Sequence, residues 1–329
     1  MAQQHAVGID LGGTSIKAGL VDDEGTIVQH ARVETQADRG PEHVLTRIVH
    51  AVEAVLTVLP KGETVLGVGI GAPGKVSLDR TTVSKPPNFP GWDIVNISAS
   101  LDGEVPGPVI VENDANAAGL GSSFAGAGQA FDSFIMVTLG TGVGGAIIHN
   151  NRLFRGTTGG AGEIGHLSID YEGPYARSGV AGAIEAYLGL HFLSHHARYR
   201  LLTRRTMLRS MAGPDLERLT PKMLYDAATE GDAAAIDMLA WAGHKLGCAL
   251  GSVVNLLDIR KVVVGGGISA ADTFLLDPAR TSLMDAVMPG MIEGVELVRE
   301  RRGNEVGVLG AARLAFERAE DEARGTLTT

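Results

Sequence analysis

The feature that most constrains the fold is a repeated arrangement of short apolar strands around glycine-rich turns. Residues 7–34 have the pattern of a strand, a glycine turn, a second strand, a polar turn and a third strand. Residues 134–154 repeat this order, with Gly140 at the place of Gly12. A repeated supersecondary unit of this kind predicts a chain built from two related halves.

The segments that follow each copy complete the two halves. After Pro41, apolar residues at helical spacing predict a helix that reaches residue 59, and buried strands follow in "LGVGIGAPG" and "PVIVENDAN". In the second half, "RKVVVGGGIS" has the same character of a strand that ends in glycines. We therefore predict an α/β fold in which two copies of a β-β-β-α-β unit face each other across a cleft.

Charge and composition exclude several classes of protein. The net charge of −10 argues against a nucleic-acid surface, which needs a basic patch. The basic stretch 198–209 is interpreted as an amphipathic helix with a solvated face. No run approaches the ~20 apolar residues of a membrane span, and the amino terminus lacks an export signal, so we expect a cytoplasmic protein. The single cysteine, Cys248, excludes an internal disulfide and is expected to be a buried structural thiol.

Three glycine-rich turns at strand ends, at residues 12–14, 140–145 and 265–267, indicate phosphate binding. Where side chains are absent, backbone N–H groups can approach phosphate oxygens closely. None of the turns has the Walker lysine pattern or a dinucleotide fingerprint, and plain hairpins remain the structural alternative. Asp10 precedes the first turn and is a candidate ligand for the magnesium ion of a nucleotide, or a turn-capping residue.

A second set of polar residues is suited to a sugar. Asn113 and Asp114 stand where a strand ends and a helix begins, so Asp114 is a candidate base, while capping of the helix is the structural alternative. Asn88 lies in a loop rich in proline. The stretch "GEIGHLSIDYEGPYARSGVAGAIEAY" adds two carboxylates and an imidazole, which by themselves fit a metal, a sugar or a turn-rich surface; these are Glu163, His166 and Glu185.

The motifs together resemble those of the ROK family (repressors, open reading frames and kinases) within the actin-like ATPase superfamily. The resemblance rests on "DLGGT", "PNFPGW", "ENDANAAGLG", "LGTGVGGAII", "GEIGH", "IEAY" and "VVVGGGIS", and it covers nearly the whole chain. It implies two ribonuclease H-like domains with an interdomain cleft. We expect a small domain at residues 1–116, a large domain at 117–307, and a terminal helix at about 308–323 that packs back on the small domain.

The resemblance also implies an activity and a set of site residues. The expected activity is transfer of a phosphoryl group from ATP, with Mg²⁺, to the 6-hydroxyl of glucose, a reaction of glycolysis. Asp114 corresponds to the catalytic base, and the sugar is expected to be bound by Asn88, Asn113, Asp114, Glu163, His166 and Glu185. The nucleotide is expected at Asp10, Gly12, Gly13, Thr14, Lys17, Gly140, Thr141, Gly142, Gly144, Gly265, Gly266 and Gly267, with magnesium at Asp10.

The chain departs from the family in one loop. Many members carry three cysteines there that bind structural zinc together with the histidine of "GH", whereas Ala176, Ser178 and Ala183 replace them here. A structural zinc site needs four ligands, so we predict no zinc and a His166 that is held by hydrogen bonds and binds the sugar. Burial of Tyr175 and Val180 is expected to fix the loop in place of the metal.

The sequence leaves several alternatives open. The sugar could be another hexose or an N-acetylhexosamine, such as fructose, mannose, allose, N-acetylglucosamine or N-acetylmannosamine, and the donor could be polyphosphate. A catalytically silent sugar-binding regulator is a further class. The family's repressors carry a helix-turn-helix before "DLGGT", and only nine residues precede Asp10, so we expect none. The expected assembly is a homodimer, with a tetramer as the alternative, and no nucleic acid or membrane partner is expected.

Overall fold

The structure is a computed structural model that describes residues 3–60 and 62–325. The described chain forms two compact units. The first comprises the residues up to Asp132, Ala146–Gly162 and the residues from Asn304 onwards; the second comprises Ser133–Gly145 and Glu163–Gly303. The domain division predicted from the sequence, and the cleft, stay predictions.

The first unit is built on a five-stranded mixed sheet in the order β3-β2-β1-β4-β8. The first three strands form an antiparallel meander, and β1, β4 and β8 run parallel to one another. Parallel neighbours need crossover connections, and the helix after β3 supplies one of them. The strands are β1 (His5–Leu11), β2 (Ser15–Asp22), β3 (Ile27–Glu34), β4 (Val68–Ala72) and β8 (Val109–Asn113).

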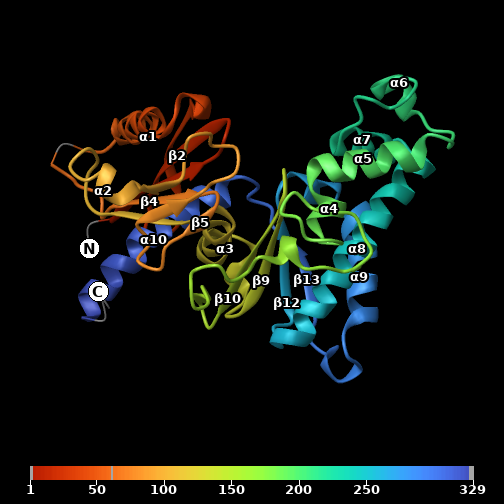
Figure 1. The fold of residues 1–329 in the computed structure, drawn as a ribbon. Helices are drawn as coiled ribbons and strands as arrows, with labels where there is room; N and C mark the ends of the chain where they lie inside the picture. Colours follow the sequence, from red (N-terminus) through yellow and green to blue (C-terminus); the bar gives the residue numbers. More distant parts are fainter. Residues whose placement is uncertain (1–2, 61, 326–329) are drawn as a thin grey trace. The chain divides into compact units, whose positions relative to one another are not determined.

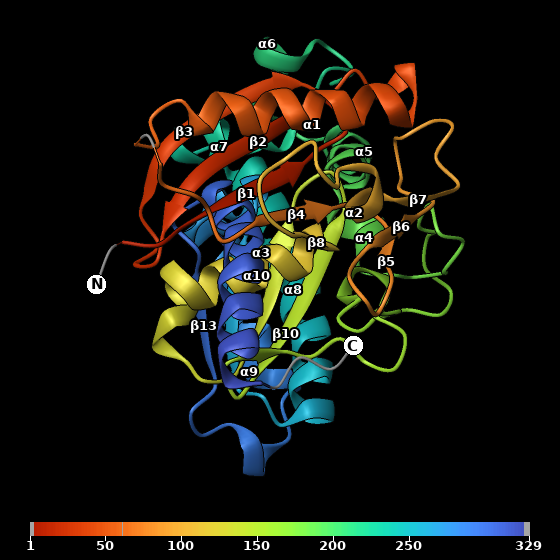
Figure 2. The ribbon, with the colours of Figure 1, turned by 90° about the vertical axis from the view of Figure 1, so that its left-hand side faces the viewer.

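Helices cover both faces of this sheet (Figure 1). On one face α1 (Pro41–Leu56) packs on β2 and β3. Its buried residues recur at helical spacing as predicted, but the helix ends at Leu56 rather than at residue 59. On the other face α3 (Asp114–Ala125) and α10 (Glu305–Arg324) lie side by side (Figure 2). A Cβ on Gly310 would lie 1.6 Å from the Ala117 carbonyl oxygen. Glycine at this position is therefore what allows the two helix backbones to approach so closely.

A small sheet beside the first one carries the loop with Asn88. Its strands are β5 (Lys75–Val76), β6 (Thr82–Ser84) and β7 (Ile94–Asn96), and α2 (Ile97–Ser100) follows them. Between β6 and β7, Phe89 and Trp92 are buried with their ring centroids 5.1 Å apart. The two buried rings hold the loop against the unit, while Asn88, directly before Phe89, is exposed.

The second sheet has the order β11-β10-β9-β12-β13, which repeats the order of the first. Here too the first three strands in the sequence are neighbours, and β12 lies parallel to β9 on one side and β13 on the other. The predicted α/β fold with a duplicated β-β-β-α-β unit is therefore confirmed. The strands are β9 (Phe134–Leu139), β10 (Val143–His149), β11 (Arg152–Leu153), β12 (Lys261–Gly265) and β13 (Glu296–Arg299).

The helices of the second unit include a long pair, α8 (Ala233–Leu257) and α9 (Thr273–Ala286), which run side by side (Figure 1). Asp232 caps α8 by accepting hydrogen bonds from the amides of Ala234 and Ala235 at 2.9 and 3.0 Å. The remaining helices are α4 (Glu185–Leu188), α5 (Leu190–Leu201), α6 (Leu208–Ala212) and α7 (Pro221–Thr229). Short 3₁₀ turns occur in both units. Those in the first unit are η1 (Ala37–Arg39) and η2 (Ala127–Ala130), and those in the second are η3 (Ile164–His166), η4 (Gly267–Ala271) and η5 (Pro289–Met291).

Two local predictions in this unit are wrong. Residues 198–209 do not form one helix, because α5 ends at Leu201 and turns separate it from α6. Cys248 is exposed rather than buried, because α8 presents its other faces to the core and leaves this position outside. In the part of the chain that the structure describes, no helix has the length and apolar character needed to span a bilayer.

Candidate active site

The junction of β8 and α3 presents the predicted base. Asn113 is the N-cap of α3, and its Oδ1 accepts hydrogen bonds from the amides of Ala115 at 2.9 Å and Asn116 at 3.2 Å. Its Nδ2 donates to the Gly74 carbonyl at 3.2 Å. The first helical residue, Asp114, is exposed, and its Oδ1 also accepts from the Ala115 amide at 2.9 Å. The capping role considered for Asn113 is thus real, and one Nδ2 hydrogen remains for a ligand.

The first glycine turn connects β1 and β2 in the same unit. Lys17 Nζ lies 2.7 Å from Asp10 Oδ2, so the two residues predicted at the nucleotide form an ion pair. A Cβ on Gly13 would lie 3.4 Å from the Cβ of Asn88, which places the Asn88 loop directly beside this turn. Asp10 offers a hard carboxylate oxygen of the kind that Mg²⁺ prefers when phosphates and water supply its other ligands. The donor chemistry therefore fits a magnesium ion that arrives with a nucleotide.

The second glycine turn is in contact with Glu185. Glu185 Oε2 accepts a hydrogen bond from the Val143 amide at 3.1 Å, at the start of β10. A Cβ on Gly142 would lie only 2.3 Å from the same oxygen, so the absence of a side chain there admits the carboxylate. Sequence reasoning assigned Glu185 to the sugar and the turn to the nucleotide. The structure shows that these two groups touch each other.

Glu163 and His166 are joined by a single 3₁₀ turn, η3, rather than an α-helix. Their closest atoms, Glu163 Oε2 and His166 Nε2, are 3.8 Å apart, which is too long for a hydrogen bond. The other ring nitrogen, Nδ1, is 3.1 Å from the Ser178 hydroxyl oxygen. Ser178 stands where the resemblance places a zinc-binding cysteine, and here its hydroxyl hydrogen-bonds the histidine that would have shared the metal.

The loop from Asp170 to Ala183 is held differently from the sequence prediction. Tyr175 and Val180 are 71% and 36% exposed, so their expected burial is wrong. The buried side chains are instead those of the two alanines at the other cysteine positions, Ala176 and Ala183, which pack with Ala186. Backbone hydrogen bonds complete the support, among them Gly182 N to Pro174 O at 2.8 Å and Ile169 N to Gly182 O at 2.9 Å.

The third glycine turn follows β12 and leads into η4. Gly266 has a φ of 84°, and a Cβ there would lie 2.3 Å from the Leu139 carbonyl at the end of β9. The turn is therefore packed directly on the strand that leads into the second glycine turn. Among residues 3–60 and 62–325, no three His, Cys, Asp or Glu side chains are grouped as a metal ion would require.

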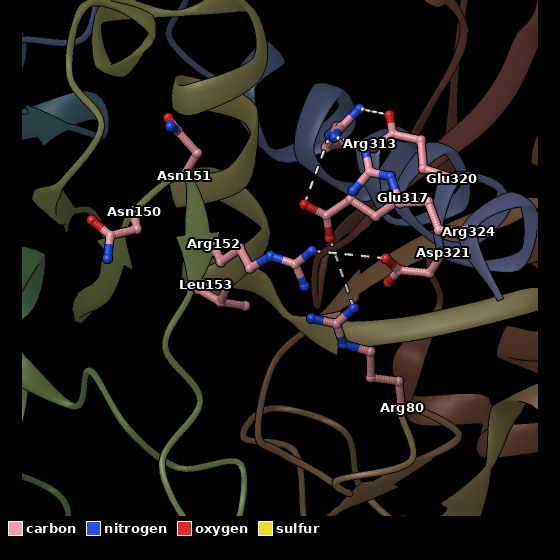
Figure 3. A pocket seen from close by; sticks show the side chains of 10 residues that line it. All are labelled: Arg80, Asn150, Asn151, Arg152, Leu153, Arg313, Glu317, Glu320, Asp321 and Arg324. Atoms are coloured by element: carbon pink, nitrogen blue, oxygen red, sulfur yellow. Dashed lines mark hydrogen bonds and ion pairs between the residues drawn. The ribbon is translucent and has the colours of Figure 1, made fainter. Parts of the chain in front are cut away.

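A cavity of about 320 Å³ in the first unit contains none of the predicted site residues (Figure 3). Four arginines and three carboxylates line it, and each arginine has a carboxylate within 4 Å. Burial raises the pKa of Glu317 even though the guanidinium groups of Arg80 and Arg313 oppose this. Because it contains none of the predicted residues, and each of its arginines is paired with a carboxylate of the same cavity, we do not assign the active site to it.

A model of the ROK family matches residues 6–318 of the chain. This chain belongs to the ROK family. Among the family's members, it is 33% identical to a glucokinase of Thermotoga maritima, over 97% of this chain and 99% of that protein. It is 35% identical to a glucokinase of Streptomyces coelicolor, over 94% of this chain and 97% of the other.

A solved ROK structure supports the same assignment. A ROK family glucokinase from Streptomyces griseus, in complex with glucose and AMPPNP, superposes with a TM-score of 0.82 at 34% identity. The match covers 95% of this chain and 99% of that one. The predicted family and fold class are confirmed by these comparisons.

Proposed function

We propose that this chain is an ATP-dependent hexose kinase, a glucokinase that phosphorylates the 6-hydroxyl of glucose. The observation that carries the proposal is the placement of Asp114. Its exposed carboxylate stands at the first position of α3, in a chain similar to glucokinases over nearly its full length.

In this proposal Asp114 accepts the proton of the attacking hydroxyl, and the oxygen attacks the γ-phosphorus of ATP. The bond from that phosphorus to the β,γ-bridging oxygen breaks, and ADP leaves. Proton transfer to a positioned carboxylate contributes ~10²-fold or more, whereas most of the acceleration in phosphoryl transfer comes from positioning and charge stabilisation. The sugar is assigned to Asn88, Asn113, Glu163, His166 and Glu185, whose carboxylates accept hydrogen bonds from its hydroxyls and whose amides donate and accept them. Each of these side chains orients one part of the sugar.

The nucleotide is assigned to the backbone amides of the three glycine turns and to Lys17. Magnesium, when bound with the phosphates, neutralises the charge that develops on the transferred group, and Asp10 is the residue that would hold it. The Lys17–Asp10 ion pair keeps the carboxylate beside the first turn. We further propose a homodimer, and ATP as the donor.

The test is a coupled ADP-release assay on the full chain with glucose, fructose, mannose, allose and the two N-acetylhexosamines. We expect the highest kcat/KM with glucose and glucose 6-phosphate as the product. Preference for another hexose would change the substrate and leave the reaction class standing. Absence of turnover with every sugar, together with measurable glucose binding, would favour a catalytically silent sugar-binding regulator.

A further inference from the structure

Glu112, directly before the proposed sugar and base residues, carries a completely buried carboxylate. Glu112 as a whole is 0% exposed, and its carboxylate contacts two guanidinium groups. Oε2 lies 2.7 Å from Arg155 Nε and 3.2 Å from Arg80 Nε. Within the described residues, neither Glu112 Oε2 nor Arg155 Nε has a partner in hydrogen-bonding geometry. The contact between these two atoms is therefore an ion pair, stabilised by the attraction of opposite charges. Burying a carboxylate is costly, and the paired cations are what make it tolerable here.

The other carboxylate oxygen is bonded to the β8–α3 junction. Glu112 Oε1 accepts hydrogen bonds from the backbone N–H of Asn113 at 2.9 Å and from Asn116 Nδ2 at 3.1 Å. Asn116 is itself 2% exposed and lies in the first turn of α3. The two bonds therefore fix a residue on each side of Asp114, with Asn113 directly before it and Asn116 two residues after it.

The two arginines are fixed by the turn that connects β5 and β6. Arg155 donates from Nη1 to the Leu78 carbonyl at 2.7 Å and from Nη2 to the Ser77 carbonyl at 2.8 Å. The backbone carbonyl of Arg80 accepts from the Val111 amide of β8 at 2.8 Å, and its side chain also approaches Glu317 of α10 at 3.9 Å (Figure 3). Burial lowers the pKa of Arg155 and the Glu112 carboxylate opposes this, as expected for a desolvated guanidinium that keeps its charge through its partner.

We propose that Glu112 is a positioning residue for phosphoryl transfer, and that Arg155 and Arg80 act through it. The proposal rests on the assignment of Asp114 as the base. The carboxylate clamps the backbone of Asn113 and the side chain of Asn116, and so sets the place of Asp114 relative to the hydroxyl that it deprotonates. A displacement of about 1 Å in such a group costs on the order of 10²-fold in rate, whereas a sugar held by several side chains keeps most of its affinity.

The experiment compares Glu112→Gln with wild type in the full chain, with glucose and ATP as substrates. Glutamine preserves the shape but removes the charge that holds both arginines. We expect kcat to fall by about 10- to 100-fold and the calorimetric Kd for glucose to change less than about threefold. The matched control is Glu320→Gln, which removes an ion-paired carboxylate 2.7 Å from Arg313 in the same unit but without a bond to β8. This control should leave kcat unchanged.

A second variant covers the case in which Glu112→Gln does not fold. Arg155→Lys keeps the positive charge but cannot make the ion pair and both carbonyl hydrogen bonds at once. It should lower kcat in the same direction, again with glucose affinity retained. Circular dichroism and thermal unfolding identify which variant is folded at the assay temperature.

The outcomes separate this inference from the proposed function. A kcat loss without a matching affinity loss supports the positioning role. A kcat within threefold of wild type, or an equal loss in kcat and affinity, overturns it. Asp114→Asn is measured in parallel: if it loses turnover while the Glu112 and Arg155 variants do not, only the positioning role fails. If Asp114→Asn keeps wild-type turnover, the proposed base is wrong and the positioning role falls with it.

Discussion

The hydrogen bond between Ser178 and His166 can be tested as the interaction that orients His166 in the absence of the cysteines. The Ser178 hydroxyl lies 3.1 Å from His166 Nδ1, while the nearest Glu163 oxygen lies 3.8 Å from Nε2. Of these two contacts only the first is short enough to orient the ring. We predict that Ser178→Ala weakens glucose binding, because the imidazole then loses the partner that fixes its plane.

The size of the effect follows from the exposure of the pair. A typical intramolecular hydrogen bond contributes about 0.5–1.5 kcal/mol net, and less where water competes for the same groups. His166 has a side chain that is 38% exposed, so the lower part of that range applies, about 0.5–1 kcal/mol. Since 1.4 kcal/mol is tenfold in affinity, the Kd for glucose should rise about two- to fivefold.

The assay is titration calorimetry with glucose, on wild type, Ser178→Ala and a matched control. The control is Ser168→Ala, which removes a hydroxyl just before this loop that donates to the Ala181 carbonyl at 2.7 Å rather than contacting His166. The control should keep wild-type affinity. Unchanged glucose affinity in Ser178→Ala would refute the reasoning, and so would one zinc ion per chain in elemental analysis of the wild-type protein.

Three further changes should have distinct effects. Asp114→Asn should lower kcat by ~10² or more with glucose binding largely retained, because an amide is a far poorer proton acceptor; a rate within a few fold of wild type would move the base elsewhere. Gly142→Ala places a Cβ 2.3 Å from Glu185 Oε2, so kcat/KM should fall; unchanged kinetics would contradict this. The free energy of unfolding in urea should fall by only about 1–3 kcal/mol, because the flexible end of the Glu185 side chain can move away. Asp232→Ala should cost about 1–2 kcal/mol of unfolding free energy at neutral pH through loss of the α8 cap. Burial raises the pKa of Asp232, but its hydrogen bonds outweigh this and hold the pKa below its ordinary value. The stabilisation is therefore present above the ordinary pKa of an aspartate and lost as the pH falls through the lowered pKa; a variant whose stability differs equally from wild type at neutral and acid pH would exclude this linkage.

The sequence alone determined the fold class and placed the candidate base where a strand ends and a helix begins. Strand alternation, helical spacing and glycine turns are local signals, and they predicted the same succession of elements along the chain in both halves. The structure shows that the two sheets also share one strand order. The polar residues at 113 and 114 follow a buried strand, so their position at a strand end could be predicted without knowing what surrounds them. The family motifs added the assignment of roles, which spacing by itself left open.

Only the tertiary structure decided which side chains meet. Arg155 and Glu112 are far apart in the chain, and their ion pair exists because two loops converge on the end of β8. The same holds for Ser178 and His166, and for the loop in which alanines rather than Tyr175 and Val180 are buried. A residue's burial depends on which face its backbone turns toward neighbours that are remote in sequence. Local sequence patterns contain no information about those neighbours. The partners of His166 and Glu112 could therefore be identified only from the folded structure.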